Sequence, residues 1–385
     1  MNYYIKADQF MLEDRMLEAG YLAITDGRFG EWSSSLPEEA EVVDWSGYTI
    51  APGLFDTHIH GINGYDVMDG TKEAVHHISK ALLSLGVTRF LPTTLTSSTD
   101  ALEQAISATV EATNEGLLGA LSEGIYLEGP FFTERYKGAQ NPKYFRDPDI
   151  DLFQQWQQLA NYTIVKIALA PERKAAIDFI KELSDCNILV SIGHSDASYD
   201  CSKRAIQAGA RNFVHLFNGM SGLHHRNPGV AGTALMTNDT FAELICDSHH
   251  VHPDVANFAW QVKGEKIVLI TDCMRAGLMP DGHYYLGEFP VVMQDGTART
   301  ETGSLAGSTL KLIDGVKHLQ SWSHRPLHEV WHLASLSPAK SLGRGHELGS
   351  IHPGKYADYV VVDNELMIHA TAVNGEVKFQ RKATE

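Results

Sequence analysis

Between about residue 50 and residue 345, short uninterrupted apolar runs alternate with longer segments in which an apolar residue recurs every three or four positions. The uninterrupted runs predict β-strands buried on both faces, and the periodic segments predict amphipathic helices. Such an alternation is typical of a parallel sheet with helices between its strands. We expect eight strands, at residues 49–58, 87–94, 124–128, 164–170, 188–194, 213–217, 241–246 and 266–271. Eight strands of this kind predict an α/β protein with a (β/α)8 TIM barrel.

The segment 100–115 has the clearest helical pattern. Asp100 stands three residues before Glu103, as in a capping box, and Ala105 and Ile106 fall on one face. The other expected helices are 72–85, 172–184, 198–208 and 253–262, with two more after the last strand.

The two ends of the chain show a different pattern, with short alternating runs and hairpin turns. Asp26-Gly27 and Asn374-Gly375 are dipeptides that favour tight turns between antiparallel strands. Neither end has enough strands to bury a face alone, so we expect both to meet in one domain. The predicted organisation is a small β-sandwich domain from residues 1–49 plus 353–385 and a catalytic barrel from residues 50–352.

The composition narrows the class of protein. With 385 residues, of which 43% are hydrophobic and 21% charged, the chain can bury one large core. Its formal net charge of −17 argues against nucleic acid or an anionic membrane as a partner. An anionic substrate would therefore have to meet a local basic cluster.

Targeting signals and cysteine spacing add two further expectations. The N-terminus lacks a basic segment followed by an apolar core, and no run approaches the ~18 apolar residues of a membrane span. We therefore expect a cytoplasmic protein. The four cysteines show no C-x-x-C spacing, so neither a disulfide framework nor a structural zinc site is expected.

Candidate chemistry begins at the end of the first expected strand, in the sequence FDTHIHG at residues 55–61. Residues two apart on a strand face the same way, so His58 and His60 can bind one metal ion. Two histidines at a strand end also occur without a metal, so the pair alone does not decide the matter.

Further metal-capable or proton-transferring side chains stand at the ends of later strands. The carboxyl ends of barrel strands converge at one mouth, where active sites are built. The residues at these ends are His58, His60, Glu128, His194, His215, His250 and Asp272. Histidines in expected helices, such as His76 and His77, carry no such argument. The sequence therefore predicts a metal site at the mouth of the barrel.

Nearly the whole chain resembles the N-acetylglucosamine-6-phosphate deacetylases of the amidohydrolase superfamily. The matching segments are APGLFDTHIHG at 51–61, LEGPF at 127–131, KGAQNP at 137–142, GHS at 193–195, HLFNGM at 215–220, RNPG at 226–229, DSHHV at 247–251, TD at 271–272 and LAGS at 305–308. The resemblance implies a metal-dependent barrel with a small β-sandwich formed by both termini, in agreement with the pattern above.

The resemblance implies that Glu128, His194 and His215 bind the main metal ion. One carboxylate and two neutral imidazoles leave a coordination position open for water, as a hydrolytic metal requires. His58 and His60 would bind a second ion, with Glu128 as a possible bridge. Some relatives lack this pair and use a single ion, so we expect one or two ions per chain and favour two. Zinc, iron(II), manganese and cobalt all accept such ligands.

Asp272 matches the catalytic aspartate of the family. It would take a proton from the attacking water and pass it to the amide nitrogen as the C–N bond breaks. A role in binding the metal or in capping the next turn is the alternative.

The implied substrate contacts are Ala139, Gln140, Asn218, Gly219, Arg226, His250, Leu305, Ala306 and Gly307. Two departures from the family pattern affect these contacts: Gln140, and Ser248 in place of the usual glycine with His249 next to it. Gln140 stands where some relatives have a histidine that polarises the acetyl carbonyl, which would leave more of that task to the metal. His249 adds a second imidazole beside His250; we favour His250, with His249 as the alternative.

The resemblance implies hydrolysis of N-acetyl-D-glucosamine 6-phosphate to D-glucosamine 6-phosphate and acetate in amino-sugar catabolism. Arg226, with His224 and His225, is the densest basic cluster and would bind the phosphate. In the family this loop tends to lie at a subunit interface, so we expect a homodimer or homotetramer. The alternatives are a D-aminoacylase-, dihydroorotase- or adenine deaminase-like enzyme, many of which use a carboxylated lysine after the fourth strand, or a scaffold without catalysis.

Overall fold

Eight parallel strands form a nearly closed barrel, as the uninterrupted apolar runs predicted. The computed structural model describes residues 2–38 and 40–382 of the chain. The barrel strands are β6 (Leu54–Ile59), β9 (Val87–Thr94), β11 (Ile125–Phe131), β12 (Ile164–Leu169), β13 (Leu189–Ile192), β14 (Asn212–Phe213), β15 (Phe241–Leu244) and β16 (Ile267–Leu269). They pair in the order β6-β9-β11-β12-β13-β14-β15-β16, and the short strand β10 (Leu121–Ser122) also pairs with β9.

The first and last barrel strands are joined mainly by contacts just beyond their ladders. Ile59 and Cys273 form an isolated parallel bridge, and the amide of Asp272 donates to the carbonyl of His58 at 2.9 Å. Deeper in the barrel, the Thr271 hydroxyl donates to the buried Asp56 carboxylate at 2.6 Å. This junction therefore fixes Asp272 beside the histidine pair of β6.

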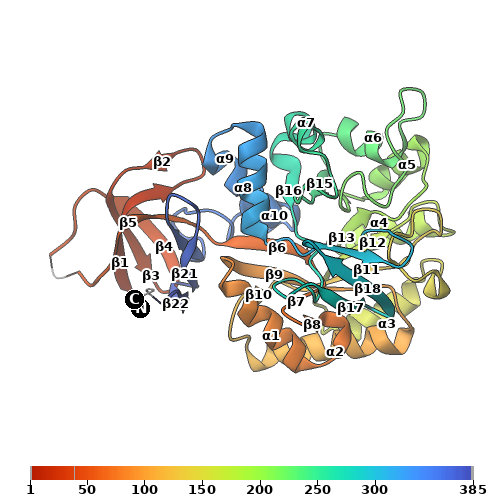
Figure 1. Ribbon diagram of the computed structural model, residues 1–385, viewed down its shortest axis with the longest axis horizontal. Helices are drawn as coiled ribbons and strands as arrows, with labels where there is room; N and C mark the ends of the chain where they lie inside the picture. The colour runs from red at the N-terminus through yellow and green to blue at the C-terminus, as the bar shows by residue number, and fades with distance from the viewer. Residues whose placement is uncertain (1, 39, 383–385) are drawn as a thin grey trace.

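Helices cover the outside of the barrel (Figure 1). They are α1 (Lys72–Leu83), α2 (Thr99–Glu115), α3 (Ile150–Leu159), α4 (Ala176–Asp185), α5 (Tyr199–Ala208), α6 (Gly229–Met236), α7 (Pro253–Lys263), α8 (Leu312–Ser323), α9 (Leu327–His332) and α10 (Leu336–Ser341), with 3-10 turns η1 (Val67–Asp69), η2 (Pro142–Tyr144) and η3 (Gly264–Lys266). The predicted start of α2 at Asp100 was wrong by one residue, because Ser98 is the N-cap and accepts from the amide of Ala101 at 3.3 Å. None of the helices in residues 2–38 and 40–382 combines the length and apolarity that a membrane crossing needs.

A second sheet is built from both ends of the chain (Figure 1). Its order is β22-β21-β20-β5-β1-β3-β4, with β2 paired to β1. The strands are β1 (Asn2–Met11), β2 (Met16–Leu17), β3 (Gly20–Thr25), β4 (Arg28–Ser33), β5 (Val42–Pro52), β20 (Tyr359–Val362), β21 (Ile368–Val373) and β22 (Glu376–Gln380). Both predicted hairpin turns are confirmed: Asp26-Gly27 joins β3 to β4, and Asn374-Gly375 joins β21 to β22. The domain boundaries at residues 49/50 and 352/353 stay predictions.

The first expected strand, 49–58, was wrong as a single element. Its first four residues belong to β5 in the terminal sheet, where they pair with β20, and the barrel strand begins only at Leu54. Gly53 stands between the two strands, where a Cβ would lie 2.2 Å from the hydroxyl of Thr88 on β9, so the close approach of β9 requires glycine.

A three-stranded antiparallel sheet after β16 was not predicted. It comprises β17 (Gly282–Leu286), β18 (Phe289–Gln294) and β19 (Thr297–Thr300), and it packs Leu286 and Val291 against Leu95 and Met274 beside the mouth. The Asp295-Gly296 turn between β18 and β19 is the signal that could have revealed it. A smaller hairpin, β7 (Gly61–Ile62) and β8 (Tyr65–Asp66), follows the histidine pair.

Candidate metal centre

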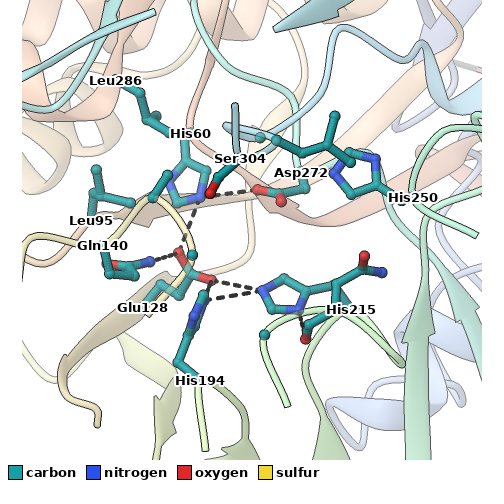
Figure 2. Close-up of a pocket in the computed structure, with 16 residues that line it drawn as sticks. His60, Leu95, Glu128, Gln140, His194, His215, His250, Asp272, Leu286 and Ser304 are labelled. Carbon is teal, nitrogen blue, oxygen red and sulfur yellow. Dashed lines mark hydrogen bonds and ion pairs between the residues drawn. The ribbon is translucent and has the colours of Figure 1, made fainter. Parts of the chain in front are cut away.

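The predicted histidines and acids converge on one cavity at the mouth of the barrel. Figure 2 shows Glu128 between the imidazoles of His60, His194 and His215, with His60 joined to both Glu128 and Asp272. The cavity is lined by His60, Leu95, Glu128, Gly138, Ala139, Gln140, His194, His215, Asn218, Gly219, His250, Asp272, Leu286, Ser304, Leu305 and Gly307.

Glu128, His194 and His215 form one buried group of possible metal ligands. Oε1 of Glu128 lies 3.3 Å from Nε2 of His194 and 3.4 Å from Nε2 of His215, and the two nitrogens are 3.2 Å apart. Nδ1 of His194 lies 3.0 Å from the backbone carbonyl oxygen of Tyr136, and Nδ1 of His215 lies 3.0 Å from the backbone carbonyl oxygen of Asn218. With Nδ1 protonated, both Nε2 atoms present lone pairs to the same point. Such an arrangement fits a cation between them.

His58, His60 and Asp272 form a second buried group. Oδ1 of Asp272 lies 3.4 Å from Nε2 of His58 and 3.2 Å from Nε2 of His60. Nδ1 of His60 donates to the carbonyl of Thr93 at 3.2 Å, which again leaves Nε2 to face the group. Within residues 2–38 and 40–382, Nε2 of His58 is buried without a hydrogen-bond partner. A buried ring nitrogen of this kind fits a metal ion better than an apolar core.

Glu128 joins the two groups. Its Oε1 faces His194 and His215, and its Oε2 lies 3.3 Å from Nε2 of His60. Oε2 also accepts a hydrogen bond of 2.6 Å from Nε2 of Gln140, whose Oε1 accepts from the amide of Thr96 at 3.1 Å. Gln140 therefore fixes the orientation of this carboxylate, with Oε1 toward His194 and His215 and Oε2 toward His60.

The charges in the cavity are strongly coupled. Burial alone would raise the pKa of Glu128 and of Asp272, but the neighbouring imidazoles, His58 foremost, lower the pKa of both carboxyls. Burial would lower the pKa of His215, but Glu128 and Asp272 raise it to about 9. The pKa of His60 is raised by the same two carboxylates against the effect of burial. Positive charge beside these carboxylates therefore stabilises their ionised form, and either protonated imidazoles or a divalent cation can supply that charge.

The backbone at three of these residues is unusual. His194, His215 and Asp272 have φ of 45°, 28° and 52°, in a region that side chains other than glycine rarely adopt. Each such residue costs about 1–3 kcal/mol and persists where the surroundings enforce it, often at functional sites. Gly219 also approaches closely, since a Cβ there would lie 3.0 Å from Nδ1 of His194. The chain thus accepts local strain to direct these side chains into the cavity.

The structure separates His250 from its alternative, His249. His250 lines the cavity, and its Nδ1 donates to Oδ2 of Asp247 at 2.6 Å. His249 is exposed and only its backbone amide contacts Asp247, at 2.8 Å. The pKa of Asp247 would rise on burial but is lowered by His250. Among the expected contacts, therefore, His250 is the imidazole that a cavity ligand can reach.

Most of the other expected substrate contacts reach the cavity, but two do not. Ala139, Gln140, Asn218, Gly219, Leu305 and Gly307 line it. Ala306 is fully buried behind the wall, in the cluster under the three-stranded sheet. Arg226 is exposed in the 221–228 loop, where its guanidinium contacts His225 at 2.6 Å. Arg226 could therefore serve only a ligand that approaches from outside this chain's own cavity.

Several residues at the site were missed. Leu95, Leu286 and Ser304 line the cavity, and Lys166 and Glu243 form a buried ion pair beneath it. The last two carried a usable signal, because each is a single charge inside an otherwise apolar strand. Leu286 belongs to the three-stranded sheet, whose sequence signal was the Asp295-Gly296 turn. Leu95 and Ser304 lie outside that sheet and carried no signal of their own.

Comparison with known proteins gives a consistent picture. Residues 49–382 match the sequence profile of the amidohydrolase family. The chain is 43% identical over 340 residues to the N-acetylglucosamine-6-phosphate deacetylase of Vibrio furnissii, covering 88% of this chain and 85% of that protein. It is 37% identical to the N-acetylgalactosamine-6-phosphate deacetylase of Escherichia coli O157:H7, covering 98% of this chain and 99% of that one.

A solved structure is similar over the same length. A mutant N-acetyl-D-glucosamine-6-phosphate deacetylase of Mycobacterium smegmatis, in complex with N-acetyl-D-glucosamine-6-phosphate, superposes with a TM-score of 0.92 at 28% identity. The match covers 98% of this chain and 100% of that one. Together with the two groups of buried donors, these similarities support a divalent metal in the cavity.

Proposed function

The chain belongs to the amidohydrolase family, and from this we propose that the protein hydrolyses the acetamide of N-acetyl-D-glucosamine 6-phosphate to D-glucosamine 6-phosphate and acetate. The observation that carries the proposal is the convergence of two buried donor groups on one cavity, in a chain whose relatives are sugar-phosphate deacetylases. The retention of all these donors argues against a scaffold without catalysis.

Glu128, His194 and His215 would hold the main ion, and His58 and His60 would hold a second, with Glu128 between them and Asp272 in contact with both histidines. When bound, a divalent ion of this kind polarises a carbonyl and lowers the pKa of water to ~7. Zinc, iron(II), manganese and cobalt all suit imidazole and carboxylate ligands. The two lysines near the end of the fourth barrel strand do not line the cavity: Lys166 pairs with Glu243, and Lys174 is exposed. Neither is therefore placed to act as a carboxylated bridge, and Glu128 occupies that position instead.

Asp272 would transfer the proton. Its carboxylate lines the cavity, within reach of a water molecule bound there, so it can accept a proton from the attacking water. It then delivers that proton to the amide nitrogen, since an amine leaves readily only when protonated. His250, oriented by Asp247, would contact the sugar, together with Asn218 and Gly219.

The phosphate would be bound by Arg226. Because this residue is exposed and does not line its own cavity, it would have to act on the cavity of a neighbouring subunit in a homodimer or homotetramer. A guanidinium matches phosphate oxygens with two parallel hydrogen bonds, and the chain's charge of −17 makes such a local cation necessary for a dianionic substrate.

The epimeric sugar is a second candidate substrate. The relative from Escherichia coli O157:H7 is named for N-acetylgalactosamine 6-phosphate and matches this chain over nearly its whole length. The two sugars differ only in the orientation of one ring hydroxyl, which a few polar contacts in the cavity can distinguish.

The test is acetate release from a panel of substrates by purified, metal-analysed protein. The panel contains the 6-phosphates of N-acetylglucosamine and N-acetylgalactosamine and unphosphorylated N-acetylglucosamine. We expect the highest kcat/KM on N-acetylglucosamine 6-phosphate. A higher value on the galactosamine epimer would select the second candidate. If none of these substrates releases acetate, the proposed function is wrong, and a D-aminoacylase-, dihydroorotase- or adenine deaminase-like activity becomes the favoured hypothesis.

A further inference from the structure

A buried carboxylate beneath the cavity contacts both groups of metal ligands. Glu243 lies on β15 and is fully buried. Its Oε2 accepts from Nδ1 of His58 at 2.9 Å and from the backbone amide of His215 at 3.2 Å. One oxygen atom thus touches the His58/His60/Asp272 group through a side chain and the Glu128/His194/His215 group through the main chain.

The second oxygen of Glu243 is held from the opposite side. It accepts from Nδ2 of Asn212 at 2.9 Å and from the ammonium of Lys166. Lys166 is 1% exposed, donates to the carbonyl of Thr57 at 3.1 Å and lies 4.0 Å from the centre of the Tyr126 ring. All four hydrogen-bond positions on Glu243 are therefore occupied by donors, and its charge is matched by one lysine that is itself shielded from water.

We propose that Glu243 is a positioning residue that sets the tautomer and ring orientation of His58, and that Lys166 is its counter-charge. A hydrogen on Nδ1, held by the carboxylate, leaves the lone pair on Nε2. That nitrogen lies 3.5 Å from Oε1 of Glu128 and 3.4 Å from Oδ1 of Asp272, and it has no hydrogen-bond partner in the part of the chain that the structure describes. Carboxylates behind metal-binding histidines act in this way, and their loss typically lowers metal affinity 10–100-fold.

The two metal groups depend on Glu243 unequally. His215 has a second anchor, because its Nδ1 faces the carbonyl of Asn218 at 3.0 Å, and Glu243 touches only its backbone. For Nδ1 of His58, Glu243 is the hydrogen-bond partner. Loss of the carboxylate should therefore weaken the ion at His58 and His60 and leave the ion at His194 and His215 nearly unchanged. This inference concerns metal binding and does not depend on which substrate is hydrolysed.

Three variants of the full-length chain separate positioning from a purely structural ion pair. In Glu243→Gln, the amide must turn its NH2 group toward two donors, either Lys166 and Asn212 or His58 and His215. The charged Lys166 attracts the amide oxygen, so the NH2 group of the glutamine faces His58. Nδ1 of His58 must then accept a hydrogen bond, and its proton moves to Nε2, the atom that should face the metal. In Lys166→Met, Oε1 keeps its hydrogen bond from Asn212 and Oε2 still accepts from His58. The double variant restores charge balance and lets the amide oxygen turn back to His58.

The experiment counts zinc ions per chain after dialysis against buffers of fixed free Zn²⁺, with thermal unfolding measured in parallel. Glu243→Gln should bind the second ion 10–100-fold more weakly than the parent while the first ion is retained. Lys166→Met should unfold at lower temperature yet keep the parent's second-ion affinity. The double variant should regain most of that affinity, and it also serves as the test if Glu243→Gln does not fold.

Three results would overturn the proposal. One is a Glu243→Gln protein that binds both ions with the parent's affinity. Another is a Lys166→Met protein that loses the second ion as strongly as Glu243→Gln, because the effect would then come from a loosened barrel. The third is a parent that holds one ion at every zinc concentration. A parent that binds two ions but releases no acetate would contradict the proposed function alone.

Discussion

The barrel contains two buried clusters of charge that differ in how their members are matched. At the amino-terminal ends of the strands, the Arg89 guanidinium donates to Asp358 at 2.6 Å, to Glu123 at 2.6 Å and to Asn374 at 2.5 Å. At the carboxyl-terminal ends, the imidazoles of His58, His60, His194 and His215 surround the carboxylates of Glu128 and Asp272.

The difference separates a structural cluster from a functional one. Around Arg89 each guanidinium nitrogen donates to at least one acceptor, and two of these acceptors, Asp358 and Asn374, come from the C-terminal part of the chain that builds the terminal sheet. That cluster is complete and joins the barrel to the sheet. At the mouth, lone pairs of several side chains point at common positions beside a cavity, an arrangement that fits a cation. Burial and charge are common to both clusters, so the direction in which the lone pairs point is what identifies a site.

The largest expected effect tests whether the mouth is a metal site. His194→Ala should abolish both metal binding at the Glu128 group and acetate release, because one imidazole ligand is lost. Metal content and turnover are measured on the same preparation. His346→Ala, at an exposed histidine, is the matched control and should leave both unchanged. Full activity in metal-free protein would contradict the assignment.

The second prediction separates proton transfer from metal binding within the same cluster. Asp272→Asn keeps the shape of the side chain but cannot accept a proton. We expect kcat to fall by about 10²–10⁴ with a modest change in KM, which is the usual contribution of general acid–base catalysis. Steady-state kinetics and metal analysis check this together. A rate within a few fold of the parent would assign the proton to another group, with His250 the first to test.

The third prediction concerns the structural cluster. Arg89→Met leaves Glu123 and Asp358 buried without their cation, so the free energy of unfolding should fall by about 3–5 kcal/mol. Urea unfolding measures this, and kcat of the folded protein should be unchanged. Arg344→Met is the matched control, because Arg344 also pairs with Glu123 but is 36% exposed, and it should cost less than ~1 kcal/mol. Loss of kcat in Arg89→Met would show that the two clusters are coupled.

The fourth prediction concerns the phosphate, for which neither buried cluster offers a free cation. Arg226→Ala should raise KM for the 6-phosphate and so lower kcat/KM. The loss corresponds to about 1.5–3 kcal/mol of binding free energy, the usual contribution of a hydrogen bond to a charged group. Activity on unphosphorylated N-acetylglucosamine, already low, should barely change. Equal losses on both sugars would remove Arg226 from the phosphate site. Analytical ultracentrifugation of the parent tests the oligomer that this role requires.

The smallest expected effect contrasts a buried histidine outside the two clusters with those at the mouth. Burial lowers the pKa of His332 to about 4, although Glu13 opposes this shift, whereas carboxylates raise the pKa of His215. In the unfolded chain, His332 therefore takes up a proton as the pH falls below 6.5. In the folded chain it does so only near pH 4. The resulting stability is complete above pH 6.5 and is lost as the pH falls toward 4.

At pH 5.5 this one group should destabilise the fold by about 1 kcal/mol relative to pH 7.5. Urea unfolding of the parent and of His332→Leu at both pH values isolates the effect, since all other titrating groups are common to the two proteins. The variant should lose about 1 kcal/mol less than the parent between the two values. An equal loss in both proteins would show that His332 titrates normally.

Much of the fold could be predicted because its signals are local. The apolar runs gave all eight barrel strands, and the Asp26-Gly27 and Asn374-Gly375 turns gave the hairpins of the terminal sheet, because turn geometry depends on two adjacent residues. The ligand positions at the strand ends followed from the rule that parallel strands place their carboxyl ends together. The division of the first strand at Gly53 was missed, because residues 49–52 pair with β20, which comes from the other end of the chain.

What the sequence by itself determined is the kind of chemistry: histidines and acids at successive strand ends, in an order that resembles one family. What only the tertiary structure decided is how each group is oriented and matched. The tertiary structure directs His250 rather than His249 into the cavity and leaves Arg226 outside it. It also brings the amide of Gln140 into a hydrogen bond with Glu128 and the carboxylate of Glu243 into a hydrogen bond with His58. These relations join residues up to 185 positions apart, as for His58 and Glu243. They depend on distances of about 3 Å that no local periodicity encodes, because hydrogen bonding and charge act through space rather than along the chain.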